Sequence, residues 1–291
     1  MLHYAVTRFE TAQLFFGHGS SNAYDEAAYL LLYALGLPPH ELDPYLTRKL
    51  DGVERAAALG LIDRRISERV PAAYLTHEAW LCGHRFYVDE RVIVPRSFIG
   101  ELLENGLAPW LADAKKIRRV LDLCTGSGCL AILAAIAFPG AQVDATDISP
   151  AALEVARRNV DEYGLAPDVK LLKADLFGSL DQQYDLIISN PPYVDAPSMR
   201  SLPPEYRKEP KLALAAGKDG LDIVHRILSE AARHLNPSGL LVVEIGHNRK
   251  QLEAHYPRLD FTWLEVAAGD EFVFALEAAQ LRSLAAQQLP H

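Results

Sequence analysis

The chain has 291 residues, 49% of them hydrophobic and 23% charged, which is typical of a folded soluble protein with room for two domains. Its net charge of −9 favours a basic protein as partner over naked nucleic acid, because nucleic-acid binders need positive charge to displace counterions from phosphates. The longest apolar run, at about residues 130–138, is too short to cross a bilayer, and residues 1–10 lack the apolar core of a signal peptide. The three cysteines form no metal-type pair, and we expect reduced thiols in a cytoplasmic protein.

Residues 1–75 are predicted to form a small helical domain. Apolar residues recur at helical spacing over residues 27–34, and a Gly-Leu-Pro-Pro stretch that begins at Gly36 ends this helix. A second helix is predicted over residues 47–69. The residues predicted to share one face of it are Leu50, Val53, Ala57 and Leu61.

Residues 76–96 are predicted to form a β-hairpin linker, because the hydrophobic period changes there from helical spacing to alternation. The alternating residues are Phe86 and Val88 before a polar turn at residues 89–91, and Val92 and Val94 after it.

Residues 97–291 are predicted to form one α/β domain. An amphipathic helix is expected over residues 98–111, and short apolar runs then alternate with helical periods. This alternation predicts a mainly parallel sheet, here of seven strands, with helices on both faces. The strands are expected at residues 118–124, 142–146, 169–173, 184–189, 240–245, 261–266 and 272–276, and helices at 129–137, 150–163 and 221–235. The last two strands can pair as a hairpin, which adds an antiparallel strand to the sheet.

A glycine-rich segment, Cys124-Thr125-Gly126-Ser127-Gly128, leads from the first of these strands into a helix. Glycines let the backbone approach a ligand closely, and the start of the helix offers unpaired N–H groups. The pattern Gly126-x-Gly128-x-x-Ala131 also fits a dinucleotide-binding loop. A plain strand-to-helix turn is the third interpretation.

Three acidic residues support a nucleoside-bearing cofactor. Asp147 ends the second strand, where a carboxylate can accept hydrogen bonds from ribose hydroxyls, and Asp175 follows the third, where it can accept from an adenine amino group. Each could instead cap a helix. Together they line the edge at which such sheets bind ligands. Asp122, before the glycine segment, suits the cationic methionyl end of S-adenosylmethionine better than a pyrophosphate.

The sequence Asn190-Pro191-Pro192-Tyr193 follows the buried strand at residues 184–189. Its plain interpretation is a stiff turn. At this edge of the sheet, however, the Asn190 side-chain oxygen and the Pro191 carbonyl can accept both hydrogens of a planar amide or amine, which directs the nitrogen lone pair at a methyl donor. The prolines hold these acceptors in place, and the Tyr193 ring can cover the planar group. The loop therefore predicts methyl transfer to nitrogen.

In these residues the chain resembles class I, or Rossmann-like, S-adenosylmethionine-dependent methyltransferases that carry the motif (Asp/Asn)-Pro-Pro-(Tyr/Phe). Residues 94–96, 206–210 and 215–221 resemble the protein N(5)-glutamine methyltransferase family. Within it, the segments at residues 7–9, 16–19, 80–84 and 124–129 are similar to the branch that acts on large-subunit ribosomal protein three. The sibling branch, which modifies release factors, usually has Gly in place of Cys124 and Arg-Pro-x-Thr-Glu where this chain has residues 96–101.

The resemblance implies methylation of a glutamine side-chain amide in that ribosomal protein, free or in a ribosome precursor, with rRNA as a further contact and without membrane or DNA. It also implies that residues 1–75 recognise the substrate. The implied catalytic residues are Asn190, Pro191, Pro192 and Tyr193. The implied cofactor-binding residues are Asp122, Cys124, Thr125, Gly126, Ser127, Gly128, Asp147, Ile148, Asp175, Leu176 and Asn190. Arg96 and Glu101 are expected at the pocket floor, or as a plain ion pair.

Several alternatives stay open. Release-factor glutamine methylation would use the same site. DNA adenine methylation would need a target-recognition domain and a basic cleft, which the sequence does not indicate. A nicotinamide-dependent oxidoreductase would leave residues 190–193 unexplained, and a non-catalytic assembly factor would bind the cofactor without turnover. No spacing of His and Cys residues predicts a metal site.

Overall fold

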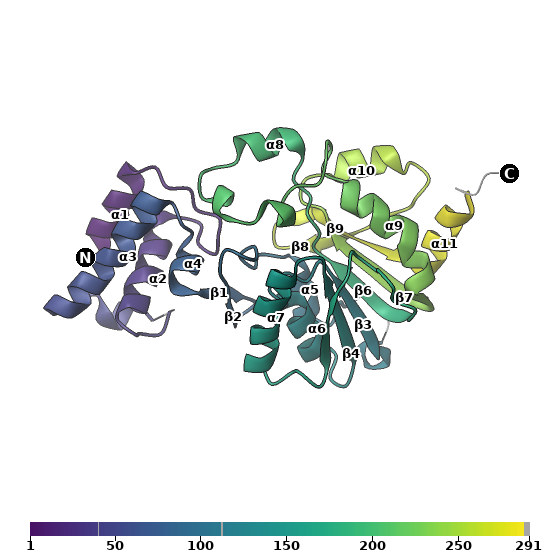
Figure 1. The fold of residues 1–291 in the computed structure, drawn as a ribbon, viewed down its shortest axis with the longest axis horizontal. Helices are drawn as coiled ribbons and strands as arrows, with labels where there is room; N and C mark the ends of the chain where they lie inside the picture. Colours follow the sequence, from purple (N-terminus) through teal and green to yellow (C-terminus); the bar gives the residue numbers. More distant parts are fainter. Residues whose placement is uncertain (40, 112, 288–291) are drawn as a thin grey trace.

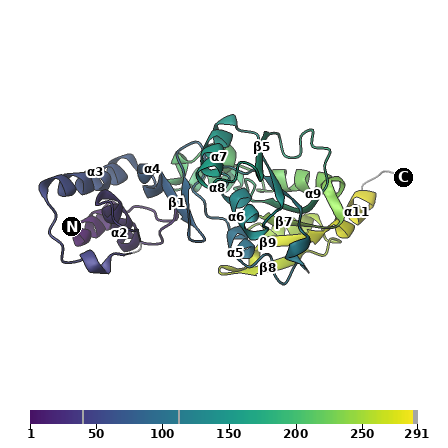
Figure 2. The same ribbon diagram turned by 90° about the horizontal axis from the view of Figure 1, so that it is seen from below.

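The structure, a computed structural model, describes residues 1–39, 41–111 and 113–287. A helical part at the N-terminal end and a larger α/β part lie side by side, with a small hairpin between them (Figures 1 and 2). Among the described helices, none combines the length and the apolar character needed to span a membrane.

Within residues 1–39 and 41–76, the structure describes helices α1 to α4 and a short 3-10 turn. Their bounds are Leu2–Thr11 (α1), Ala23–Ala34 (α2), Gly52–Glu68 (α3) and Ala72–Thr76 (α4), with the 3-10 turn at Asp43–Tyr45. Helix α3 begins five residues later than residue 47, where the sequence predicted it. Asp51 and Glu54 form a capping box there, in which each side chain accepts a hydrogen bond from the other residue's backbone N–H.

The residues predicted to share one face of α3 do not make up the face that is buried, although Leu61 is partly buried against the core. Val53 is 80% exposed, whereas Ala58, Ile62 and Arg65 are buried. The helix is turned so that Arg65 points into the protein, where it forms two ion pairs. A hydrophobic pattern alone could not place Arg65 on the buried face, because arginine side chains are rarely buried.

The hairpin consists of β1 (Glu78–Leu81) and β2 (His84–Tyr87), so the predicted position of its turn, at residues 89–91, is wrong. The turn is Cys82-Gly83, with positive φ at both residues (51° and 72°), as the twist of a two-residue hairpin requires. The predicted alternation over residues 88–94 instead comes from an irregular segment whose valine side chains pack against helix α7. Val88, Val92 and Val94 share a buried cluster with Val155 of that helix.

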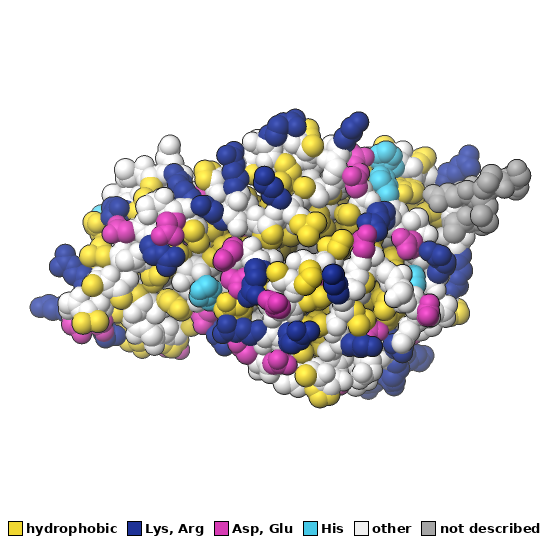
Figure 3. Space-filling view, viewed as in Figure 1, with side chains coloured by type: hydrophobic (Ala, Val, Ile, Leu, Met, Phe, Trp, Pro, Cys, Tyr) yellow, Lys and Arg dark blue, Asp and Glu magenta, His cyan; other side chains and the backbone are white. Residues whose placement is uncertain are grey.

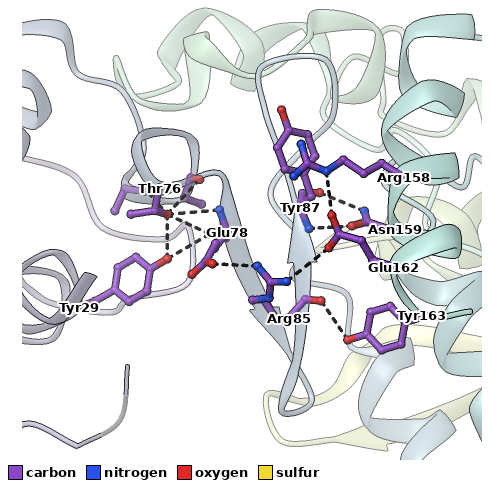
Figure 4. A network of polar contacts seen from close by, with 11 residues as sticks. Tyr29, Thr76, Glu78, Arg85, Tyr87, Arg158, Asn159, Glu162 and Tyr163 are labelled. Atoms are coloured by element: carbon purple, nitrogen blue, oxygen red, sulfur yellow. Dashed lines mark hydrogen bonds and ion pairs between the residues drawn. The ribbon is translucent and has the colours of Figure 1, made fainter. Parts of the chain in front are cut away.

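The hairpin contacts both parts of the protein (Figure 4). On the helical side, the Tyr29 hydroxyl of α2 donates to the carbonyl of Glu78 in β1 (3.3 Å). On the other side, Tyr87 donates its N–H to Asn159 Oδ1 of α7 (2.7 Å), and Asn159 Nδ2 donates to the carbonyls of Tyr87 (3.0 Å) and Ser127 (2.8 Å). One buried asparagine therefore links the hairpin to the glycine-rich segment.

The α/β part contains one seven-stranded sheet in the order β5-β4-β3-β6-β7-β9-β8. The strands are β3 (Arg119–Leu123), β4 (Gln142–Asp147), β5 (Val169–Lys173), β6 (Tyr184–Ser189), β7 (Leu235–Glu244), β8 (Thr262–Val266) and β9 (Gly269–Glu277). Pairing is parallel from β5 to β7, and β9 is antiparallel to both β7 and β8. The predicted mainly parallel sheet with a terminal hairpin is confirmed.

Helices cover both faces of this sheet (Figure 1). The helices of the α/β part are α5 (Ile99–Glu104), α6 (Cys129–Ala137), α7 (Pro150–Glu162), α8 (Ala196–Ser201), α9 (Asp222–His234), α10 (Arg249–His255) and α11 (Ala278–Gln287), with 3-10 turns at Ala114–Lys116, Tyr206–Lys208 and Lys211–Ala213. Helix α8 has no buried residue and lies apart from the sheet. The helix predicted over residues 98–111 ends at Glu104, because Gly106 and Leu107 adopt positive φ. The central strands explain the two layers: Leu186 and Ile188 pack toward α5 and α6, while Ile187 packs toward α9.

A buried group of ion pairs joins the helical part to the segment at residues 203–210 of the α/β part. Arg65 Nε lies 2.7 Å from Glu26 Oε1, and Arg65 and Arg69 both contact Glu205 (3.3 and 3.0 Å). Burial alone would raise the pKa of Glu205, but hydrogen bonds and the Arg65 charge lower it instead. The carboxylate is therefore charged at the junction, where Oε1 makes the contacts with both arginines and Oε2 has no hydrogen-bond partner among the described residues.

Candidate active site

The glycine-rich segment turns the chain from β3 into α6 through three residues with positive φ: Cys124 (60°), Gly126 (55°) and Gly128 (80°). A side chain on Gly128 would lie 3.1 Å from Ala156 Cβ, so glycine allows α6 and α7 to approach each other. A side chain on Gly126 would meet no atom within 4 Å. Gly126 therefore faces open space, as expected where a ligand approaches the backbone.

Asp147 holds this segment in place from the end of β4. Its Oδ2 accepts a hydrogen bond from the Gly126 N–H (2.9 Å), and its Oδ1 accepts one from the Ser149 N–H (2.8 Å). Burial raises its pKa, which these donors partly offset. The neighbouring Ile148 is 48% exposed. A fixed carboxylate beside an exposed apolar side chain fits a ribose and the face of its base.

Asp122 lies fully buried beneath the segment. Its Oδ2 accepts from Thr125 Oγ1 (2.5 Å), and its Oδ1 has no donor at hydrogen-bond distance among the described residues. Burial raises the pKa of Asp122 to about 7, and the Thr125 hydrogen bond opposes the rise. An unpartnered buried oxygen at this place fits the cationic end of a ligand, which would lower the pKa again.

Asp175 is found after β5, as predicted, but it also has a partner within the protein. Its Oδ2 lies 2.9 Å from an Arg226 nitrogen of α9, and its side chain is half-exposed. Leu176, the next residue, is buried with φ of 54°. An adenine amino group would therefore share this carboxylate with Arg226.

The Asn190–Tyr193 loop lies directly beside the glycine-rich segment. Strands β6 and β3 pair in register at Ser189 and Leu123, and the Ser189 hydroxyl donates to the Leu123 carbonyl (2.9 Å). Asn190 directly follows Ser189 in the chain, and Cys124 directly follows Leu123, so the two loops begin side by side. Within the described part of the chain, the partly exposed Asn190 carboxamide has no hydrogen-bond partner. It can therefore accept a substrate amide beside the cofactor segment.

Tyr193 is held on three sides. Its hydroxyl donates to Glu244 Oε1 (3.4 Å), its carbonyl accepts from Asn248 Nδ2 (2.8 Å), and its ring lies so close to Gly246 that a side chain there would be 2.7 Å from it. Burial raises the pKa of Tyr193, so the hydroxyl stays protonated at neutral pH.

Glu244, at the end of β7, is a site residue that the sequence analysis missed. It is fully buried, and its Oε2 accepts from Ser97 Oγ (2.7 Å) and from the Phe98 N–H (2.9 Å). Burial raises its pKa to about 7, against the lowering effect of these hydrogen bonds. The available signal was a single acidic residue within the otherwise apolar run at residues 240–245.

Arg96 and Glu101 do not pair with each other. Arg96 forms a two-pronged contact with Glu209 (2.5 and 2.7 Å) and lies over the Tyr206 ring at 5.3 Å, whereas Glu101 accepts from the Ala267 N–H (2.9 Å). Burial alone would raise the pKa of Glu209, but the nearby His18 ring (3.6 Å) and the hydrogen bonds and charge of Arg96 lower it to about 2. Arg96 therefore anchors the segment that faces the helical part, and Glu101 fixes the β8–β9 turn.

The glycine-rich segment and the Asn190–Tyr193 loop meet where the strand order reverses between β3 and β6, the usual ligand site of such sheets. Figure 3 shows hydrophobic side chains gathered in the middle of this face. The strand order and this pair of loops define a class I methyltransferase.

Comparison with known proteins identifies the family. The family model "Methyltransferase small domain" matches residues 105–201. The ribosomal protein uL3 glutamine methyltransferase of Neisseria meningitidis serogroup B is 58% identical over 281 residues, which cover 97% of this chain and 93% of the relative. The protein of the same name from Burkholderia pseudomallei is 55% identical, over 98% and 95% of the two chains. This chain belongs to the family of ribosomal protein uL3 glutamine methyltransferases.

A solved structure shows the same fold at low sequence identity. The catalytic domain of hMettl16, in complex with a hairpin of the MAT2A 3'UTR, is 17% identical and has a TM-score of 0.50, over 76% of this chain and 80% of that one. The expected class I fold, enzyme class and methyltransferase activity are confirmed, and S-adenosylmethionine is the cofactor.

Proposed function

We propose that this enzyme methylates the side-chain amide of a glutamine in ribosomal protein uL3, in the cytoplasm, on the free protein or on a ribosome precursor. The observation that carries the proposal is the unpartnered Asn190 carboxamide beside the glycine-rich segment, in a chain whose relatives carry this activity in their names. The chain differs from the release-factor branch at Cys124 and at residues 96–101, which favours uL3 over a release factor.

In the proposed mechanism, Asn190 and Pro191 activate a weak nucleophile. An amide nitrogen lone pair is delocalised into its carbonyl, so the nitrogen must be oriented and its hydrogens bound. The Asn190 oxygen and the Pro191 carbonyl accept the two N–H groups, and the Tyr193 ring, fixed by Glu244 and Gly246, covers the planar amide and excludes water.

The cofactor supplies an electrophilic methyl group. When bound, S-adenosylmethionine would transfer this methyl group to the amide nitrogen and leave as its demethylated thioether, and the nitrogen would release one proton to solvent. Asn190 and Pro191 stabilise the positive charge on the nitrogen until the proton leaves. The ribose would be held by Asp147 beside Ile148, and the methionyl end by Asp122 with Thr125. The adenine would be held by Asp175. The turns around these three groups are shaped by Cys124, Ser127 and Leu176.

We further propose that residues 1–75 recognise the substrate, with residues 76–96 as linker and residues 97–291 as the methyltransferase domain. A cavity of about 1090 Å³ lies between the helical part and β1. Its lining residues include Asp25, Glu41, Asp43 and Glu78, and no described lining residue is Lys or Arg. A ribosomal protein needs positive charge to bind rRNA, so an acidic cavity suits a basic segment of it.

The reaction is tested by incubating the enzyme and labelled S-adenosylmethionine with purified uL3 and, separately, with a release factor. We expect the label on one uL3 glutamine. Asn190→Ala should lose this transfer while S-adenosylmethionine still protects it against thermal unfolding, which shows an intact cofactor site. Full activity of Asn190→Ala would refute the amide-binding mechanism, and label on the release factor alone would refute the substrate.

The domain proposal has its own test. Glu41→Lys combined with Asp43→Lys reverses two exposed charges of the cavity, neither of which belongs to the glycine-rich segment or to the Asn190–Tyr193 loop. We expect a higher KM for uL3 and an unchanged KM for S-adenosylmethionine. An unchanged KM for uL3 would contradict substrate binding at this cavity.

A further inference from the structure

Two histidines and an aspartate converge on the surface beside α10, outside the site described above. Asp219 lies in the loop before α9, His225 lies in the first turn of α9, and His255 is the last residue of α10. One ligand atom from each residue lies within 4.8 Å of the other two. In the corresponding region of Figure 3, histidine and acidic side chains lie next to each other on the surface.

We propose that Asp219, His225 and His255 bind a divalent transition-metal ion such as Zn²⁺. Imidazole nitrogens and a carboxylate are common zinc ligands, and tetrahedral coordination at about 2.0–2.1 Å places ligand atoms about 3.3 Å apart. His255 Nε2 and Asp219 Oδ2 already lie 3.0 Å apart. The His255 side chain is 51% exposed, so it can rotate to complete the geometry. A water molecule would supply the fourth ligand.

Contacts outside the three ligands favour this arrangement. His225 Nδ1 lies 2.8 Å from the Tyr256 hydroxyl, which leaves Nε2 as the metal-binding nitrogen. Asp219 Oδ1 accepts from the Leu221 N–H (3.1 Å), which directs Oδ2 to His255. Metal-binding histidines usually have such an outer partner on the second ring nitrogen, which fixes the ring.

The ion would connect the surface to the catalytic loop. Gly220, next to Asp219, packs so closely on the Tyr193 carbonyl that a side chain there would lie 2.4 Å from that oxygen. Asn248 Nδ2 donates to the same carbonyl (2.8 Å) and lies 3.5 Å from the Gly220 carbonyl. The proposed metal would therefore fix the position of Gly220 against the Tyr193 carbonyl without contacting the substrate. This role does not depend on which protein the enzyme methylates.

The test is calorimetric titration of the tag-free full chain with zinc chloride, with magnesium chloride as the comparison. We expect one Zn²⁺ per chain in the micromolar range or tighter and no magnesium binding. Thermal unfolding should shift upward by about 5–10 °C at a hundredfold excess of zinc over Kd. His255→Gln and Asp219→Asn should each weaken zinc binding at least tenfold.

The matched control is His3→Gln, which removes an exposed histidine of α1. It should bind zinc as the unchanged chain does. Thermal protection by S-adenosylmethionine in every variant reports an intact fold separately from zinc. Absence of stoichiometric zinc binding to the unchanged chain would overturn the proposal. Equal binding by His255→Gln, Asp219→Asn and the unchanged chain would do the same, because the metal would then bind elsewhere.

Discussion

Replacing Glu244 by glutamine should change how the stability of the enzyme depends on pH. The pKa of Glu244 is about 7 in the folded chain against 4.5 for an ordinary glutamate, because the carboxylate is buried. Folding therefore takes up a proton between these two pH values. The contribution of Glu244 to stability is unfavourable above this window, and stability falls as pH rises through it.

The magnitude follows from the difference between the two pKa values. At about 1.4 kcal/mol per pKa unit, the charged Glu244 costs about 3 kcal/mol of folding free energy above pH 7. Glu244→Gln keeps the shape and can still accept the hydrogen bonds of Ser97 and Phe98, but it has no charge to bury. We expect the variant to match the unchanged chain near pH 4.5 and to gain up to about 3 kcal/mol relative to it by pH 8.

Urea unfolding at half-unit pH steps, followed by tryptophan fluorescence, measures this difference. Glu265→Gln is the matched control, because Glu265 lies exposed on β8. The free energy of unfolding of Glu265→Gln, relative to the unchanged chain, should not rise between pH 4.5 and pH 8 as it does for Glu244→Gln. A stability difference between Glu244→Gln and the unchanged chain that stays constant from pH 5 to pH 8 would refute the reasoning. Methyl transfer should fall in the same variant, because the Tyr193 hydroxyl loses its carboxylate partner.

Three further changes test other parts of the structure. Asp147→Ala should weaken binding of S-adenosylmethionine at least tenfold, measured by thermal protection, because Gly126 loses the acceptor that fixes its N–H; protection equal to the unchanged chain would contradict the assigned role. Arg65→Met should cost about 3–5 kcal/mol in urea unfolding, because Glu26 and Glu205 lose their common partner, and adding Glu26→Gln should recover part of it. Gly128→Ala should cost about 1–2 kcal/mol, because alanine at φ of 80° is strained and meets Ala156, and an equally stable variant would speak against tight packing of α6 on α7.

The sequence predicted the α/β part well because its strands are continuous apolar runs with clear boundaries. Helix α6 and strands β5 and β6 have the predicted bounds, and the loop at residues 190–193 lies where the strand alternation placed it. The motif residues could be found because glycines and prolines mark them, and their proximity followed from the common edge of parallel strands.

Features that depend on buried polar groups were not predicted. The buried face of α3 includes Arg65, and the position of Tyr193 depends on Glu244 and Ser97, which are distant in sequence. The hairpin turn was missed because Cys82 is an unusual residue for positive φ. Pairings over more than a hundred residues leave no periodic signal in a single sequence.

The junction between the two parts has a consequence for exchanging specificity between related enzymes. A chimera that carried only residues 1–76 into another methyltransferase would bring Arg65 and Arg69 without Glu205. It would also bring His18 without Glu209, whose carboxylate lies 3.6 Å from the His18 ring. The transplanted domain would then leave the buried Arg65 with Glu26 alone, Arg69 without its carboxylate partner and the His18 ring without its carboxylate neighbour. A functional exchange has to move the segment at residues 203–210 together with the helical domain, so the unit of specificity here is discontinuous in the sequence.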